Sequence, residues 1–341
     1  MPSSKLGGFK VLRDVSVFSV AVPRDGDSYP PQVLDVISDQ QINLPYVSCL
    51  ATDSCWQILF AVPSGEQDRV GQIIRESVPG EGLVSIASCV VLSLFPHRSD
   101  PGIAGTTIWV LERENLRFHA MANSPSAISL LLQEECLAGV SNAFVHAFDF
   151  PPECAPVDWN LAQKGKEQIY KEVVASYQEK QPKVYGLEIR EGLDLYLLEV
   201  KKQGLGLLAK SFRQLGDEGI GLSYISSLPL PGMRNHSMAL CLPATVRDRA
   251  TSLLSDPMAE IGLKIAENIC LFTMNGPHFG DRYGLAWILM RAFQEHHLDL
   301  LALNCTVASM TGIVWYNQTD LAIKAIRTRF HVPEVTRRVI L

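Results

Sequence analysis

The stretch that decides the fold is residues 90–134, VVLSLFPHRSDPGIAGTTIWVLERENLRFHAMANSPSAISLLLQE. The apolar run at its start has the composition of a β-strand, and a polar turn separates it from an amphipathic, helix-like segment at 103–115. A second strand-like run, 116–122, follows and ends at the tight turn Asn123-Ser124-Pro125-Ser126. The same order of elements recurs four times along the 341 residues, so the sequence predicts a protein built of repeats.

The two halves of the chain resemble each other. The segment GFKVLRDVSVF at residues 8–18 matches GLEIREGLDLY at residues 186–196 without a gap, and both indicate a short strand, a turn and a second strand. Each half then divides again into two modules. The predicted boundaries are 8–88 and 89–150 for the first two modules, 151–183 for a linker with a helix, and 184–267 and 268–341 for the last two.

Hydrophobic periodicity places the elements within each module. For example, Leu285, Ile288, Leu289, Ala292 and Phe293 fall at helical spacing and form one apolar stripe. The predicted strands are 15–22, 44–51, 56–62, 83–88, 90–95, 116–122, 128–132, 144–150, 193–200, 220–228, 237–242, 263–266, 269–274, 298–306, 312–315 and 334–340. The predicted helices are 31–40, 67–76, 103–115, 134–142, 162–179 in the linker, 205–216, 245–254, 282–296 and 319–330.

Each module therefore runs strand–helix–strand–strand–helix–strand, the split βαβ arrangement. The predicted fold class is α+β, with four ferredoxin-like βαββαβ modules arranged as two pairs. Both helices of a module lie on one face of its antiparallel sheet, and the other face must be covered. We therefore expect the modules to pair, and we expect the whole protein to form a homodimer.

Composition and charge limit the possible functions. The net charge of −6 argues against nucleic acid as a partner, and the apolar runs are far shorter than the ~20 residues that cross a membrane. Residues 1–8 are short and polar, unlike a signal peptide. The eight cysteines form no CxxC pair and most lie in apolar runs, as expected of buried thiols in a reducing compartment. We expect a cytoplasmic protein.

Common catalytic and cofactor motifs are absent from the sequence. It contains no P-loop, no HExxH and no GxSxG. Gly204, Gly206 and Ala209 match the dinucleotide-binding pattern, but no acidic residue lies in 224–231, about 20 residues further on. Close packing of a helix on a sheet explains the glycines better. His296 and His297 are adjacent, so they point in different directions from a helix. We expect no cofactor and no bound metal.

The second module resembles the ACT domain. The segments that carry the resemblance are Ser99-Asp100-Pro101-Gly102-Ile103-Ala104 before a helix, then Asn115-Leu116-Arg117-Phe118, then Ala122-Asn123-Ser124-Pro125-Ser126-Ala127-Ile128-Ser129. It is most similar to the regulatory region of aspartokinases. The third and fourth modules have Gly204–Ala209 and Arg282–Ala286 at the same loop–helix junction, whereas the first has the longer turn Asp25–Pro31. Nothing in the chain resembles the catalytic domain of an aspartokinase.

This resemblance implies a site for an amino-acid effector between two modules, formed by the first loop, the start of the first helix and the second strand. Amide groups at a helix N-terminus suit the carboxylate of such a ligand. The fourth module has the more polar loop, where Asp281 is either a ligand contact or a helix cap. In the second module, the turn is either a ligand contact or a tight hairpin. The candidate ligand-binding residues are Asn275, Gly276, His278, Gly280, Asp281, Arg282, Tyr283 and Gly284 of the fourth module, and Arg98, Asp100, Gly102, Asn123, Ser124 and Ser126 of the second.

Three hypotheses follow for the function. The first is a non-catalytic regulatory protein that binds an amino acid or related metabolite at paired ACT modules and signals by a conformational or oligomeric change. A biosynthetic enzyme or a regulator would be its partner. The second is a scaffold of ACT modules whose ligand sites have decayed and which only oligomerise or interact. The third is an enzyme with a non-standard site at a module interface. We expect the first, and therefore no enzyme.

Overall fold

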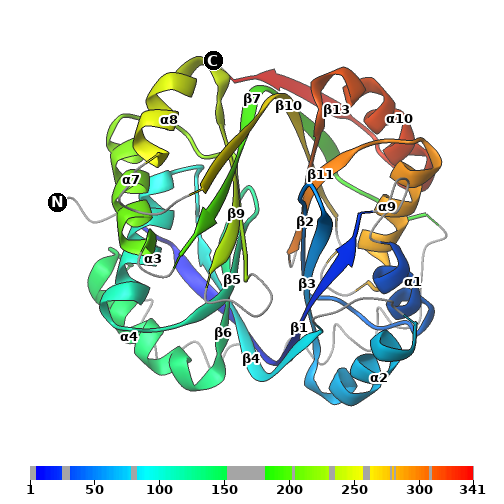
Figure 1. The fold of residues 1–341 in the computed structure, drawn as a ribbon, viewed down its shortest axis with the longest axis horizontal. Coiled ribbons are helices and arrows are strands. Elements are labelled where there is room, and N and C mark those ends of the chain that lie inside the picture. The colour runs from blue at the N-terminus through cyan, green and yellow to red at the C-terminus, as the bar shows by residue number, and fades with distance from the viewer. Residues whose placement is uncertain are drawn as a thin grey trace.

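The computed structural model describes residues 5–24, 31–77, 83–151, 181–201, 204–229, 235–255, 262–276, 279, 282–306 and 309–340. Within these residues thirteen strands form one mixed sheet, and eight α-helices cover it. Figure 1 shows the sheet folded into two layers in the middle of the molecule, with helices on both outer sides. The predicted helix 162–179 lies outside the described residues.

The observed elements follow the predicted order. The strands are β1 (Gly8–Pro23), β2 (Tyr46–Ala51), β3 (Cys55–Pro63), β4 (Val84–Phe95), β5 (Phe118–Asn123), β6 (Ile128–Gln133), β7 (Gly186–Val200), β8 (Tyr224–Pro229), β9 (His236–Pro243), β10 (Gly262–Asn275), β11 (Leu300–Thr306), β12 (Ser309–Trp315) and β13 (Val335–Val339). The helices are α1 (Pro31–Asp39), α2 (Gln67–Ser77), α3 (Pro101–Arg113), α4 (Leu137–Ala147), α7 (Leu205–Asp217), α8 (Arg247–Leu254), α9 (Leu285–Glu295) and α10 (Thr319–Arg329).

Four long strands pass from one layer to the other. β1, β4, β7 and β10 each bend at a residue with a left-handed backbone, and these residues are Asp14, Ser88, Gly192 and Asn268. The register of β1 with β4 and of β7 with β10 shifts at these bends, as it does at a β-bulge. The fully buried carboxylate of Asp194 fixes one bend, because it accepts hydrogen bonds from Arg247 Nε at 2.6 Å and from the amide of Asn268 at 3.0 Å.

Two strand pairs join the halves of the chain. In one layer β2 runs antiparallel to β11, with Leu50 opposite Ala302 and Val47 opposite Cys305. In the other layer β5 runs antiparallel to β8, with Met121 opposite Ser227. Each half therefore contributes strands to both layers.

The core has three parts. One lies between the first layer and α1, α2, α9 and α10, and a second lies between the other layer and α3, α4, α7 and α8. The third fills the space between the two layers and includes Tyr46, Leu50, Leu195 and Tyr224. The sheet faces without helices thus cover each other within one chain. The homodimer stays a prediction, and bare sheet faces no longer supply a reason for it.

The predicted strand 144–150 is wrong. α4 continues to Ala147, and Phe144 packs edge-on against Phe9 at 6.5 Å between ring centres. The place beside β4 that this strand would take is filled by the start of β1, where Phe9 pairs with Leu94. The two segments predicted as strand–turn–strand, 8–18 and 186–196, are likewise parts of the single bent strands β1 and β7.

The boundaries of the modules stay predictions. β4 crosses the predicted boundary between residues 88 and 89 without a break, and β10 crosses the one between 267 and 268. None of the helices among the described residues is both long and apolar enough to span a membrane.

Candidate functional site

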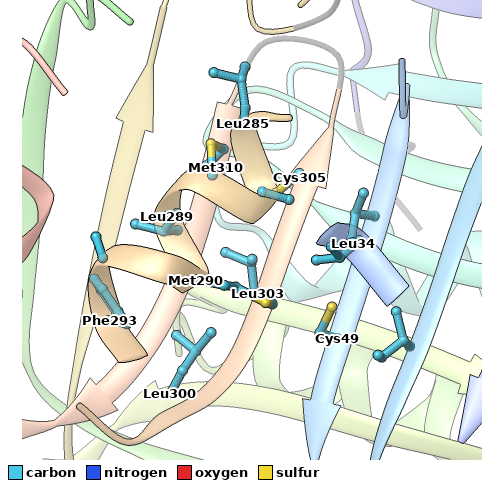
Figure 2. Packing of buried hydrophobic residues seen from close by; sticks show 14 of the residues in the cluster. Leu34, Cys49, Leu285, Leu289, Met290, Phe293, Leu300, Leu303, Cys305 and Met310 are labelled. Atoms are coloured by element: carbon cyan, nitrogen blue, oxygen red, sulfur yellow. The ribbon is translucent and has the colours of Figure 1, made fainter. Parts of the chain in front are cut away.

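Two helices from different halves of the chain frame the candidate site. α1 and α9 lie on the outer face of the layer in which β2 pairs with β11. Figure 2 shows Leu34 of α1 on one side of this junction and Leu285 of α9 on the other, with Cys305 of β11 between them. The sequence predicted a ligand at such a junction of two modules, at the start of the helix that became α9.

A cavity of about 20 Å³ lies between the two helices, which is room for about one water molecule. Most of its wall is apolar, and the polar exceptions are Ser38, Arg282 and Thr306. The apolar side chains of the wall are those of Leu34, Ile37, Ile42, Leu44, Val47, Phe279, Leu285, Ala286, Trp287, Cys305 and Met310. Among the described residues of the wall there is a single cation and no carboxylate.

Hydrogen-bond donors gather at the α9 side of the cavity. Gly284 has φ = 77° and accepts at its carbonyl from the amide of Ile288 at 2.8 Å, which starts the helix. The first amides of a helix have no acceptor within it, and their partial positive charge favours an anion. The indole Nε1 of Trp287 is buried and has no hydrogen-bond partner in the described structure. A carboxylate at the start of α9 would accept hydrogen bonds from these amides.

The structure places the predicted residues of the fourth module in two groups. Arg282 and Gly284 line the cavity, and Tyr283 lies between them in the chain, half-buried. Asn275 ends β10, where its carbonyl accepts from the amide of Tyr185 at 2.8 Å, and Gly276 follows it, buried. His278, Gly280 and Asp281 lie outside the described residues, so both roles proposed for Asp281 stay open.

The predicted residues of the second module lie at the other junction of the halves, where β5 meets β8. Asp100 caps α3, because its Oδ1 accepts from the amide of Gly102 at 2.7 Å. Asn123 is buried and reaches across to the other half. Its Oδ1 accepts from the amide of Ile225 at 2.8 Å, and its Nδ2 donates to the carbonyl of Ser223 at 3.3 Å. These groups are already bonded within the chain.

The turn after Asn123 has the geometry of a tight hairpin. The Oγ of Ser124 accepts from the amides of Ala127 at 3.0 Å and Ser126 at 3.3 Å. Arg98 is exposed and has a left-handed backbone, with φ = 53°. The proposed ligand contacts of Arg98, Ser124 and Ser126 stay predictions.

A buried histidine belongs to the same junction. The Nε2 of His97 lies 3.2 Å from the Nδ2 of Asn123. Burial lowers the pKa of His97 to about 4, so this ring is neutral at pH 7. It therefore contributes no charge to attract an anion at this junction.

Three residues of the cavity wall that carry polar side-chain atoms, Ser38, Trp287 and Thr306, were not predicted from the sequence. Ser38 and Thr306 lie outside the loops that the ACT resemblance indicates, and Trp287 was counted only as part of a helix. For Ser38, the constant spacing of the repeats is the signal that could have indicated it. α1 ends at 39 and β2 begins at 46, and α7 ends at 217 and β8 begins at 224, so Ser38 corresponds to Gly216. The same spacing therefore indicates that Ser38 of α1 faces the glycine before α9, as Gly216 of α7 faces Gly102.

The described residues contain no group of three or more His, Cys, Asp or Glu side chains that is placed to hold a metal ion. The seven described cysteines are free thiols, five of them buried.

The fold is aspartokinase-like. The crystal structure of aspartate kinase from Synechocystis superposes on this chain with a TM-score of 0.75 at 14% sequence identity, and the match covers 97% of this chain and 56% of that one. This chain therefore spans little more than half the length of that kinase. Regulatory subunits of aspartate kinase also match: that of Thermus thermophilus in its ligand-free form (14% identity, TM-score 0.38, 43% of this chain and 100% of that chain) and that of Thermus flavus (16%, 0.39, 43% and 99%).

No protein-family model matches the chain. No curated protein matches it either. At 14% identity, the match to the Synechocystis kinase shows the shared fold and nothing finer.

The comparison contradicts the prediction that the protein is not an enzyme. The solved structure that covers 97% of this chain is that of an enzyme, an aspartate kinase. The prediction rested on the resemblance to regulatory ACT modules, on the lack of any segment that resembles an aspartokinase catalytic domain, and on the absence of common catalytic motifs. We therefore do not retain it.

Proposed function

We propose that this chain is a regulatory unit built of four ACT modules, which binds a small amino acid between α1 and α9. The observation that carries the proposal is the cavity at this junction, which Arg282 and the start of α9 line. The indole N–H of Trp287, another residue of the wall, is buried and has no hydrogen-bond partner among the described residues. Such donors suit a carboxylate. The partner that it regulates would be a catalytic unit of the aspartate-kinase class.

The wall of the cavity indicates the kind of amino acid. Leu34, Val47 and Met310 offer apolar contact on the side opposite the donors. A volume of about 20 Å³ is too small for a complete amino acid, so the helices must move apart when one binds. This favours a short apolar side chain, such as that of L-valine. It also links binding to the separation of two elements from different halves.

The proposed mechanism is a shift of population. A ligand that binds the open arrangement of α1 and α9 better than the closed one raises the fraction of open molecules. The carboxylate would bind at α9 and the side chain would contact α1, so the ligand would define the distance between the halves. A catalytic partner that contacts both halves would then respond to this distance.

Thermal denaturation with each of the twenty amino acids tests the proposal. We expect L-valine or a similar residue to raise the Tm by several degrees at millimolar concentration, by mass action on the folded state. Arg282→Met should weaken binding about tenfold, the loss of one charge-assisted hydrogen bond. Arg327→Met on the exposed face of α10 is the matched control and should bind as the parent does.

Isobutylamine, which is L-valine without its carboxylate, should not bind. Unchanged melting curves with all twenty amino acids would contradict the proposed function and would favour the scaffold. Equal binding by Arg282→Met and the parent would place the ligand elsewhere in the molecule.

A further inference from the structure

The junctions α1–α9 and α3–α7 can be compared residue by residue. α3 ends at 113 with β5 beginning at 118, and α9 ends at 295 with β11 beginning at 300, so the two helices correspond at a constant offset. Gly102 then corresponds to Gly284, and Gly105 to Trp287. On the facing helices Ser38 of α1 corresponds to Gly216 of α7. The chain thus contains two versions of one helix junction.

At the α3–α7 junction the two backbones touch. A Cβ atom on Gly216 would lie 3.0 Å from the amide nitrogen of Gly102, and one on Gly105 would lie 2.7 Å from the carbonyl oxygen of Ala209. Contacts closer than 3.0 Å are essentially never made by a real Cβ, so only glycine fits at residue 105. This is the most extensive contact between two of the described helices. The space beside the start of α3 is therefore occupied by the backbone of α7.

At the α1–α9 junction larger side chains stand at the same positions. The hydroxyl of Ser38 lies 2.7 Å from where a Cβ on Gly284 would be, so a side chain touches here in place of the backbone of a glycine. Trp287 stands where α3 has Gly105, and its ring packs partly buried against the core of this layer. The contact of α1 with α9 is much smaller than that of α3 with α7, and the cavity lies beside it.

We infer that Trp287 and Ser38 hold α1 and α9 apart, so that their junction is the one that accepts a ligand. Gly105 and Gly216 let α3 and α7 pack backbone to backbone, so that this second junction stays closed. The inference rests on the proposed function for the identity of the ligand. It adds that each chain binds one molecule, that Trp287 determines where it binds, and that the ligand moves α1 against α9 while α3 and α7 stay fixed together.

Calorimetric titration with L-valine tests the stoichiometry on the full chain. We expect one molecule bound per chain. Two molecules per chain, with binding at the second site weakened by Asp100→Ala, would overturn the inference and leave the proposed function intact. Absence of binding would contradict the proposed function. The difference between the α1–α9 and α3–α7 junctions would then be tested by hydrogen exchange.

Two tryptophan variants test the role of Trp287. Trp287→Phe keeps a ring at the junction but removes the indole N–H, and it should weaken L-valine binding about tenfold, the loss of one hydrogen bond. Trp287→Gly copies the residue of α3, and it should abolish binding. The matched control is Trp109→Phe on α3, which should bind L-valine as the parent does. Unchanged affinity in Trp287→Phe and Trp287→Gly would overturn the assignment to Trp287.

Hydrogen exchange of the amides tests the asymmetry without any ligand. In the free protein, the amides of α1 and α9 should exchange at least tenfold faster than those of α3 and α7, because local opening costs less where fewer contacts break. L-valine should slow exchange in α1 and α9 alone. Equal exchange in the two helix pairs, or faster exchange in α3 and α7, would overturn the inference.

Discussion

At the scale of single residues, two histidines, the buried His97 and the half-buried His236, link the stability of the protein to pH. His97 is bonded to Asn123, and His236 is stacked on Phe118 with 4.9 Å between ring centres. Burial lowers the pKa of each to about 4, and for His236 the nearby His119 adds to the effect. Both rings are therefore neutral in the folded protein over most of the pH range in which free histidine is charged.

We expect the free energy of unfolding to fall as the pH is lowered from 6.5 to 4. In this window the unfolded chain binds protons at His97 and His236 and the folded chain does not, so protonation favours unfolding. The loss is about 2 to 3 kcal/mol for each histidine at pH 4.5, from the shift between about 6.5 and about 4. Urea denaturation at pH 7.5 and pH 4.5 measures it.

Carboxylates also lose stabilising ion pairs in acid, so the histidine contribution needs its own control. The double variant His97→Gln, His236→Gln should lose several kcal/mol less between the two pH values than the parent does. An equal loss in the variant and the parent would show that these rings are protonated in the folded state.

At the scale of elements, the close packing of α3 on α7 depends on the absence of a side chain at residue 105. Gly105→Ala places a methyl group 2.7 Å from the carbonyl oxygen of Ala209 and 3.0 Å from the amide nitrogen of Arg213. Backbone atoms of a helix cannot move aside singly, so α3 and α7 must separate. We expect a loss of about 1 to 3 kcal/mol in the free energy of unfolding, partly offset by the better helix propensity of alanine.

Gly139→Ala in α4 is the matched control for this substitution. Its nearest neighbour is the end of the flexible Leu116 side chain at 3.3 Å, and that side chain can rotate away. This variant should be as stable as the parent or more stable, by up to about 1 kcal/mol. A Gly105→Ala protein that melts at the same temperature as Gly139→Ala would contradict the close packing of α3 and α7.

Hydrophobic periodicity predicted most elements, because it reflects which face of each helix or strand is buried. The repeats bury the same faces of their corresponding elements. The stripe from Leu285 to Phe293 lies on α9 as expected, and four of its five members are buried. The prediction failed at 144–150 because the strand that fills that edge comes from residues 8–12, far away in sequence. Arg282 and Gly284, which line the cavity, were proposed as ligand-binding residues from the resemblance of their segment to the loop–helix junction of ACT domains. Ser38 was missed because it comes from the other half.

At the scale of the whole molecule, a polar bridge connects the two layers through the apolar core. Ser48 of β2 donates to the Oδ1 of Asn304 at 2.8 Å and lies 2.6 Å, Oγ to Oγ, from Ser226 of β8. The Nδ2 of Asn304 donates to the carbonyl of Ile225 at 3.0 Å. All these side chains are at most 1% exposed. The bridge fixes how one layer sits on the other, which apolar contacts alone do not specify.

Asn304→Ala should lower the free energy of unfolding by about 2 to 4 kcal/mol, because it leaves the hydroxyl of Ser48 and the carbonyl of Ile225 with fewer partners in a buried place. Chemical denaturation measures this change. Asn317→Ala, at an exposed position, is the control and should have almost no effect. Equal midpoints for the two variants would contradict a contribution of the bridge to stability.

The joining of both halves in one chain has a further consequence. If two identical subunits formed the same arrangement, the symmetry axis would make their two helix junctions identical, and every substitution would appear in both. Here the position that is Gly105 in one junction is Trp287 in the other, and these two positions are encoded separately. Two junctions encoded separately in one chain can therefore differ in how closely their helices pack, which the two junctions of a symmetric dimer of halves cannot do.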